Sequence, residues 1–315
     1  MGRGRVVALV VVGLTLVLAG CGGRAEPATL RIGVLPILDA LPMYVAAEEG
    51  MFAERGVEVA FVAAASAAER DQLLQAGEVD AIVTDLVALA LYNRDDARVV
   101  AVRYAMTPTP EFAQFRVMAS RQSGIASPGE LAGVEIGISE GTVIEYVTDR
   151  MLEAEGLSPG EVESLAVPKI PERMALLGSG ELRAATLPEP LASLATMDGA
   201  VVVVDDRVHP ETSCSVYAFR KEVVDERPEA VRGFLAAIAE ASEAINADKG
   251  RWSDLLGERE LVPQPLMGSY RLPDYPGDQA PSEAQFADAV DWLQETGRLM
   301  QRPTYADSVD SSFLP

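Results

Sequence analysis

A serine flanked by glycines is the feature of this chain that most directly suggests covalent chemistry. The segment "GISEG" (137–141) matches the G-x-S-x-G pattern, in which Ser139 would be a hydrolase nucleophile at a turn between a strand and a helix. Asp205 or Asp206, and then His209, follow in the chain order that a catalytic acid and base would need. The pattern therefore allows a hydrolase.

Two features of the same residues argue against hydrolysis. His209 is the only histidine of the chain, lies three residues after one candidate acid and four after the other, and is followed directly by a proline. The sequence also has no glycine-rich oxyanion loop ahead of the serine. We therefore expect no enzymatic activity and no catalytic residue. An esterase or hydrolase that uses Ser139 stays open as the alternative.

A second group of polar residues lies where predicted strands end and helices begin. Ligands bind at the carboxyl ends of the strands in open α/β sheets. Helix starts present free backbone N–H groups, so Gly141 and Thr142 could hold an oxyanion. Asp, Ser and Thr are also favoured helix caps, which is the alternative role for several of these side chains. The predicted ligand-binding residues are Asp39, Ser66, Thr84, Asp85, Ser139, Glu140, Gly141, Thr142 and Glu189.

These residues are positioned by short apolar strands that alternate with amphipathic helices. Such alternation predicts an α/β fold whose mostly parallel sheets carry helices on their faces. The predicted strands are 30–35, 57–63, 80–84, 98–105, 111–120, 134–138, 182–187, 200–205 and 213–220. The main predicted helices are 41–55, 67–76, 142–154, 171–177, 227–245 and 282–300.

The order of the elements predicts two lobes. Residues 30–110 and 134–205 form two similar blocks, and extended segments at 111–120 and 213–220 connect them as hinge strands. The helical tail must pack somewhere, so we expect a first lobe of residues 30–110 plus 221–315 and a second lobe of residues 111–220. Two lobes joined by two strands can close around a ligand.

Composition excludes several classes of function. The chain has 26 Lys plus Arg against 48 Asp plus Glu, a net charge of −22, which disfavours nucleic-acid partners. One histidine and two cysteines far from any regular ligand spacing predict no metal site, and we expect no cofactor. Cys214 lies in a strand-like run and is expected to be a buried apolar residue.

The amino terminus has the three parts of a secretory signal. Arg3 and Arg5 precede an uncharged apolar run and small residues, which predicts a signal peptide over residues 1–20. The order Leu-Ala-Gly-Cys ending at Cys21 resembles the lipobox of bacterial lipoproteins, which implies lipidation of Cys21 and a linker over 21–29. We expect an exported protein whose acyl chains hold it on the outer face of the cytoplasmic membrane.

Several segments together resemble one family of receptors. They are "LRIGVLPILDALPMYVAAEEGMFAERGVEVAFV", "QLLQAGEVDAIVTD" and, more weakly, "LAGVEIGISEGT" and "LPEPLAS". Their order and spacing are similar to those of the periplasmic substrate-binding proteins of the nitrate, taurine/alkanesulfonate and thiamine-precursor ABC importers. The resemblance implies the two-lobed type II binding-protein fold. It also implies a small-molecule solute and a permease–ATPase complex as partners.

The solute is expected to differ from a simple oxyanion. The candidate ligand residues include Asp39, Asp85, Glu140 and Glu189, and carboxylates accept hydrogen bonds. We therefore favour an amine or an aminopyrimidine-like solute over sulfonate or nitrate. We expect a monomer, and a lipoprotein that senses the same solute is a further alternative.

Overall fold

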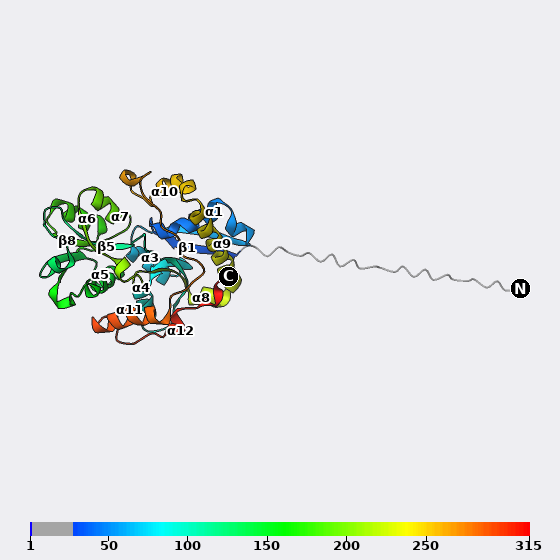
Figure 1. Ribbon diagram of the computed structural model, residues 1–315. Helices are drawn as coiled ribbons and strands as arrows, with labels where there is room; N and C mark the ends of the chain where they lie inside the picture. Colours follow the sequence, from blue (N-terminus) through cyan, green and yellow to red (C-terminus); the bar gives the residue numbers. More distant parts are fainter. Residues whose placement is uncertain (2–27) are drawn as a thin grey trace.

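The computed structural model describes Met1 and residues 28–315, and residues 28–315 form two lobes (Figure 1). The predicted signal peptide (1–20) and the predicted lipidation site at Cys21 lie outside the described residues. Each lobe is built on a five-stranded sheet, which confirms the predicted α/β, two-lobed fold class. No helix of the described part of the chain is long and apolar enough to cross a membrane.

The first sheet has the strand order β2-β1-β3-β10-β4. Its parallel strands β1–β3 are joined through helices, whereas β10 enters antiparallel between β3 and β4. The strands are β1 (Ala28–Val34), β2 (Val57–Ala63), β3 (Ala81–Asp85), β4 (Val99–Met106) and β10 (Ser215–Arg220). The helices between the first four are α1 (Leu41–Glu48), α2 (Met51–Glu54), α3 (Ala67–Gln75) and α4 (Leu86–Tyr92).

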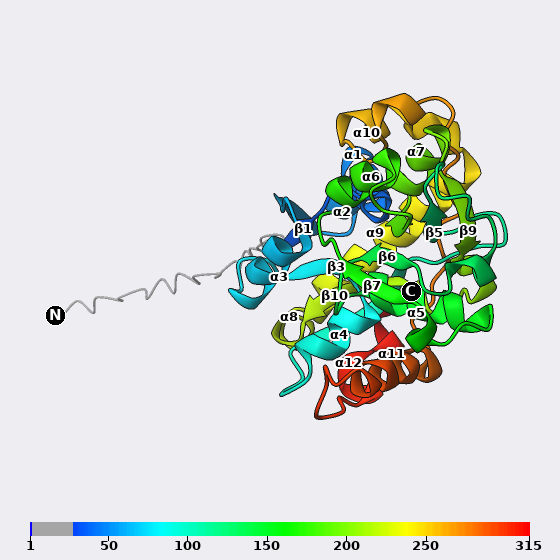
Figure 2. The same ribbon diagram turned by 90° about the vertical axis from the view of Figure 1, so that its left-hand side faces the viewer.

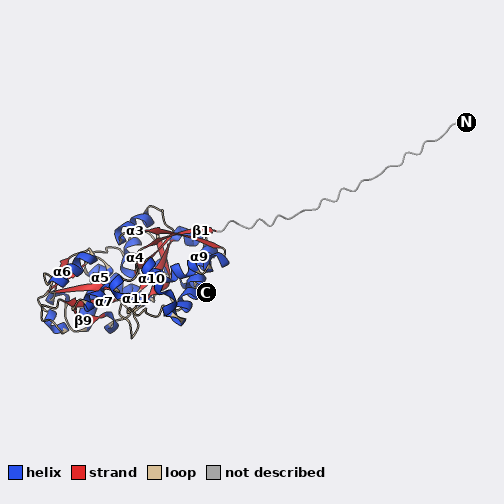
Figure 3. Ribbon diagram, turned by 90° about the horizontal axis from the view of Figure 1, so that it is seen from above, coloured by secondary structure: helices blue, strands red, loops and turns tan. Residues whose placement is uncertain are grey.

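The second sheet repeats this plan, with the order β7-β6-β8-β5-β9. Here β5 is the antiparallel strand, paired with β8 on one side and β9 on the other. The strands are β5 (Phe115–Ala119), β6 (Glu135–Ile138), β7 (Glu163–Ala166), β8 (Ala184–Pro188) and β9 (Val201–Asp205). The helices are α5 (Val143–Ala154), α6 (Ile170–Ser179) and α7 (Leu191–Met197). Figure 3 shows the strands gathered into these two separate groups.

Two crossover segments join the sheets. Residues 107–114 lead from β4 to β5, and residues 206–214 lead from β9 to β10. Residues 213–220 were expected to be the hinge strand that ends the second lobe, and the pairing of β10 with β3 and β4 places 215–220 in the first sheet. Strand β10 is antiparallel to β3 and β4 because the chain enters it on its way back from the second lobe.

The carboxy-terminal segment packs mainly on the first lobe, as the blue and yellow-to-red parts of Figure 1 show. The ring of Phe234 stacks on Phe52 at 5.3 Å and meets Tyr217 and Phe219 edge-on. This contact fixes the long helix of the segment over the sheet. The helices of the segment are α8 (Lys221–Glu226), α9 (Pro228–Ala247), α10 (Ser253–Glu258), α11 (Glu283–Glu295) and α12 (Tyr305–Ser308).

Helix α11 also binds the second lobe. Asp288 accepts hydrogen bonds from the Tyr146 hydroxyl (2.5 Å) and from Arg150 Nε (3.0 Å), both on α5. The indole N–H of Trp292 donates to Asp149 of α5 at 2.8 Å. A continuous apolar core runs beneath these bonds from α4 through α5 to α11. The lobes are therefore held together by more than the two crossovers.

Two of the differences between the observed and the predicted elements have a local cause. The helix predicted over 41–55 is divided into α1 and α2, because Gly50 adopts a left-handed conformation (φ 74°) that ends the first helix. Strand β7 was not predicted, since its four residues are all exposed and have no apolar pattern.

Candidate functional site

Asp39 and its neighbours form a polar cluster beside the carboxyl end of β1. Asp39 lies in the 3₁₀ turn η1 (Leu38–Ala40), and its carboxylate accepts a hydrogen bond from the Ser215 hydroxyl of β10. The Tyr217 hydroxyl donates to the Asp39 carbonyl at 3.4 Å, and the Tyr275 hydroxyl donates to the Leu38 carbonyl at 2.8 Å. The residues of this cluster thus come from the turn after β1, from β10 and from the carboxy-terminal segment.

Glu189 brings the second lobe to the same place. It follows β8, its side chain is only 3 % exposed, and it forms an ion pair with Arg116 of β5 at 2.8 Å. Its Oε2 accepts a hydrogen bond from the Tyr270 hydroxyl at 3.2 Å. Tyr270 packs against the core of the first lobe, so this bond connects the two lobes. We call Asp39, Arg116, Glu189, Tyr270 and Tyr275 the interlobe cluster.

Burial sets the electrostatics of the interlobe cluster. It raises the pKa of Asp39, which the Ser215 hydrogen bond only partly offsets. It also raises the pKa of Glu189, against the lowering effect of Arg116. Burial and the nearby Glu189 carboxylate raise the pKa of the Tyr270 phenol. The site therefore contains carboxyl groups that a cationic or proton-donating ligand would help to keep ionised.

Figure 2 views the same region from the side of the second lobe. Helix α7, which begins just after Glu189, lies there beside the orange segment that follows α10. Leu194 of α7 packs against the core of the first lobe, and η6 (Gln264–Leu266) contacts α7. The two lobes are thus in contact around the interlobe cluster.

The remaining first-lobe predictions form no hydrogen bond with the interlobe cluster, although Asp85 lies opposite Ser215 in the pairing of β3 with β10. Ser66 is exposed and caps α3 by accepting from the Glu69 amide at 3.2 Å. Asp85 caps α4 by accepting from the Ala88 amide at 2.9 Å, and Thr84 is buried just before it. Capping thus uses both Ser66 and Asp85.

Polar groups of the loop from Ser139 to Thr142 also form hydrogen bonds within the protein. The Gly141 amide, predicted to hold an oxyanion, donates to the Glu145 carboxylate at 2.5 Å, and that carboxylate is paired with Arg298. Thr142 caps α5 through the Ile144 amide at 3.2 Å. Glu140 is exposed. The Gly141 amide is therefore already occupied by a carboxylate of the protein, and the Thr142 side chain acts as a helix cap.

Ser139 does not form the catalytic arrangement considered above. Its hydroxyl donates to the Pro168 carbonyl at 3.2 Å and accepts from Arg173 Nη1 at 3.0 Å. The His209 ring faces Glu211, with 2.9 Å between Nδ1 and Oε1. Asp206 is buried and accepts from backbone amides of the first crossover. The serine, histidine and acid are thus each bonded to other partners.

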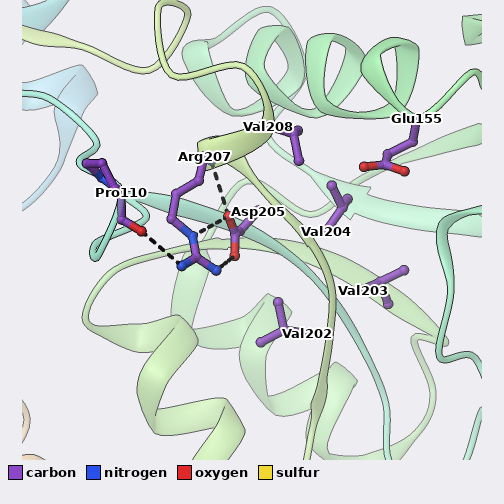
Figure 4. Close-up of a pocket in the computed structure, with 8 residues that line it drawn as sticks. All are labelled: Pro110, Glu155, Val202, Val203, Val204, Asp205, Arg207 and Val208. Carbon is purple, nitrogen blue, oxygen red and sulfur yellow. Dashed lines mark hydrogen bonds and ion pairs between the residues drawn. The ribbon is translucent and has the colours of Figure 1, made fainter.

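A surface pocket lies along the outer edge strand β9 (Figure 4). Two of its charged side chains are paired with each other, because Arg207 Nη2 lies 2.6 Å from Asp205 Oδ2, and Arg207 Nη1 also donates to the Pro110 carbonyl at 3.3 Å. None of the predicted ligand residues lines it. The pocket is connected to the interlobe cluster through the pairing of β5 with β9, in which Arg116 lies opposite Asp205.

Metal and thiol chemistry find no support among the described residues. Residues 28–315 contain no group of three or more His, Cys, Asp or Glu side chains that could hold a metal ion. Cys214 is buried, and burial raises the pKa of its thiol to about 12, which disfavours the nucleophilic thiolate.

Several polar residues that contact predicted ones were not themselves predicted, among them Arg116, Arg173 and Tyr270. The sequence did indicate that Arg173 is buried, because Arg173 shares a helix face with the apolar Ile170 and Leu177. Tyr270 lies in an irregular proline-rich stretch, where no periodicity indicates which side chains turn inward.

Solved structures share this architecture over nearly the whole chain. The aliphatic sulphonate binding protein SsuA from Escherichia coli matches with a TM-score of 0.75 and 18 % identity, over 90 % of this chain and 92 % of that one. A ligand-binding component of an ABC-type import system from Staphylococcus aureus, solved with zinc bound, gives 0.73 and 17 %, over 91 % and 97 %. The nitrate-binding protein NrtA from Synechocystis gives 0.66 and 14 %, over 91 % and 87 %.

The chain has the two-lobed α/β fold that these periplasmic binding proteins share. A model of the NMT1-like family matches residues 23–254, which is most of the chain. The chain therefore belongs to the NMT1-like family. No curated protein sequence matches it significantly.

Proposed function

We propose that this protein is an extracytoplasmic solute-binding protein that captures a small molecule between its lobes and delivers it to an ABC importer. The observation that carries the proposal is the hydrogen bond between Glu189 of the second lobe and Tyr270, which packs on the first lobe, beside Asp39. Groups from both lobes converge there, at the strand ends where open α/β sheets bind ligands. The class of the similar structures supports the same role.

The chemistry of the interlobe cluster favours an amine or an aminopyrimidine-like solute. Asp39 and Glu189 offer carboxylate oxygens that accept hydrogen bonds from N–H groups. Tyr270 and Tyr275 add aromatic rings on which a flat solute could stack. A ligand that touches both lobes favours the closed form by the difference between its affinities for the closed and open forms.

The proposed setting of the receptor is the outer face of the cytoplasmic membrane. Cleavage after residue 20 and lipidation of Cys21 would tether it there as a monomer, near a permease and its ATPase. Replacing Cys21 by serine should abolish incorporation of labelled fatty acid and release the protein from membranes. Retention of the label in that variant would contradict the tether.

A ligand screen tests the receptor role. We would incubate the exported protein with amines, aminopyrimidines, sulfonates and oxyanions, and measure binding by native mass spectrometry and by the shift in melting temperature. We expect an amine or aminopyrimidine to bind. Failure of every small solute to bind would refute the receptor role, and binding of sulfonates alone would refute the proposed solute class.

A pair of variants places the site. Glu189→Gln should weaken binding of the identified solute roughly tenfold or more, because a charged hydrogen-bond acceptor contributes about 1.5–3 kcal/mol. Glu240→Gln is the matched control, since it removes an exposed carboxylate of α9 that is paired only with Arg55. Equal affinity in both variants would contradict the placement. Esterase activity lost in Ser139→Ala would instead favour the hydrolase alternative.

A further inference from the structure

Arg173 of α6 carries a buried guanidinium whose hydrogen bonds are only half satisfied. Its Nη1 donates to the Ser139 hydroxyl at 3.0 Å and to the Val167 carbonyl at 3.1 Å. Its Nε and Nη2 are buried and have no hydrogen-bond partner among residues 28–315. The residue as a whole is 0 % exposed, so water does not solvate these two nitrogens from the surface. Burial of these two N–H donors therefore costs folding free energy unless a hydrogen-bond acceptor from another group bonds to them.

The other buried arginines of the described chain are neutralised by carboxylates. Arg70 pairs with Asp71 at 2.7 Å, Arg103 with Asp278 at 3.2 Å, and Arg150 with two acids on α5 and α11. Arg173 is absent from the ion pairs found among residues 28–315. Burial alone lowers its pKa to about 10, so the guanidinium still carries its charge at neutral pH. A buried charge without a partner is strongly disfavoured in protein interiors.

The two unsatisfied nitrogens lie on one edge of the guanidinium. Nε and Nη2 of an arginine donate in parallel, in the fork that matches the two oxygens of a carboxylate or a similar oxyanion. Two hydrogen bonds from Nη1, to the Ser139 hydroxyl and the Val167 carbonyl, hold the guanidinium in place. Ser139 follows β6 and Val167 follows β7. Arg173 thus presents its free edge near the strand ends of the second sheet, which is the sheet that also carries Glu189.

We propose that the Nε and Nη2 edge of Arg173 binds an oxyanion of the captured solute, at a site in the second lobe near the carboxyl ends of β6 and β7. The inference rests on the proposed receptor function and adds an acidic group to the solute that this function requires. Both nitrogens are covered in this conformation, so the oxyanion enters when the surrounding segments part. Ser139 is then a positioning residue that orients the arginine.

The test compares the full exported chain with Arg173→Met, which keeps an unbranched apolar stem and removes the charge and the donors. The probes are propionate, ethanesulfonate and the uncharged propionamide, at constant ionic strength, and binding is measured by thermal shift and calorimetry. We expect propionate or ethanesulfonate, but not propionamide, to bind the wild-type protein. Arg173→Met should weaken that binding roughly tenfold or more. Binding of propionate alone assigns a carboxylate site, and binding of ethanesulfonate alone assigns a sulfonate site.

A second measurement separates an anion site from a structural arginine. Without any probe, Arg173→Met should melt at a higher temperature than the wild type, because it removes an unpaired buried charge. Arg121→Met is the matched control, since Arg121 is exposed in the same lobe and its loss changes the net charge equally. This control should change neither anion binding nor the melting temperature.

The outcomes distinguish this inference from the receptor role. Equal anion binding by wild type and Arg173→Met, or no binding of either anion by the wild type, overturns the anion site. If the ligand screen has meanwhile found a solute that binds Arg173→Met as tightly as wild type, the receptor role stands and only the anion site fails. If no solute binds in that screen, the receptor role fails as well. A lower melting temperature of Arg173→Met without loss of anion binding assigns Arg173 a purely structural role.

Discussion

Asp206 offers a sharp test of how the two crossovers are held together. It begins the second crossover, is 0 % exposed, and accepts hydrogen bonds from the backbone amides of Gln114 (3.1 Å) and Phe115 (3.0 Å) at the end of the first. Burial raises the pKa of its carboxyl to about 7, in spite of these donors. The protonated form is therefore favoured in the folded protein up to near-neutral pH.

The sign and size of the effect follow from linkage. Because the folded-state pKa lies above the ordinary value of 3.8, the folded protein binds more protons than the unfolded chain between these two values. The stabilising contribution is complete below about pH 4 and is lost as the pH rises to about 7. A shift of about three units corresponds to about 4 kcal/mol, of which about 3 kcal/mol falls between about pH 5 and pH 8.

The assay is the free energy of unfolding from urea titrations at about pH 5 and about pH 8. The wild type should lose about 3 kcal/mol more than Asp206→Asn over this interval, because asparagine keeps the size and an acceptor but does not titrate. Asp225→Asn, at an exposed position, is the control and should follow the wild type. An identical pH dependence in wild type and Asp206→Asn would refute the reasoning, since it would mean that the buried carboxyl does not titrate in this range.

Three further predictions concern packing and the site. Phe234→Ala should lower the free energy of unfolding by about 3–5 kcal/mol in urea titrations, because the Phe234 ring is fully buried among other aromatic rings. A loss below about 1 kcal/mol would contradict this packing. Tyr270→Phe should weaken binding of the identified solute about three- to tenfold in calorimetry while preserving the fold in circular dichroism, because the hydrogen bond to Glu189 is lost; unchanged affinity would place Tyr270 outside the site. Gly137→Ala should destabilise the second lobe by about 1–3 kcal/mol in thermal melts, because an added methyl would lie 2.7 Å from Leu182 Cδ1; a wild-type melting temperature would show that Leu182 moves aside freely.

The sequence predicted the elements of the fold well wherever apolar periodicity was strong. The strand at 57–63 and the helix over 142–154 are found within a residue of their predicted bounds, because burial on one sheet or helix face fixes the pattern. The exposed β7 left no such pattern and was missed. Gly50, which divides a predicted helix, shows that one backbone conformation can end a periodic segment.

Predicting the site was harder, because the same residue types cap helices and bind ligands. Ser66, Asp85 and Thr142 all cap the helices that follow them, as their types allow. Asp39 and Glu189 instead accept hydrogen bonds from Ser215 and Tyr270, which are distant in sequence. Local sequence cannot separate these outcomes, since both place an acid after a strand.

The sequence by itself determined the alternation of strands and helices, the division into two sheets and the acidic surface charge, because these depend on composition and on periodicity over a few residues. Only the tertiary structure decided that Glu145 takes the Gly141 amide, that Tyr270 reaches Glu189, and that Arg173 is left without a counter-ion. The physical reason is that a hydrogen bond or an ion pair needs its two groups within about 3 Å, and residues separated by tens of positions meet at that distance only when the chain is folded.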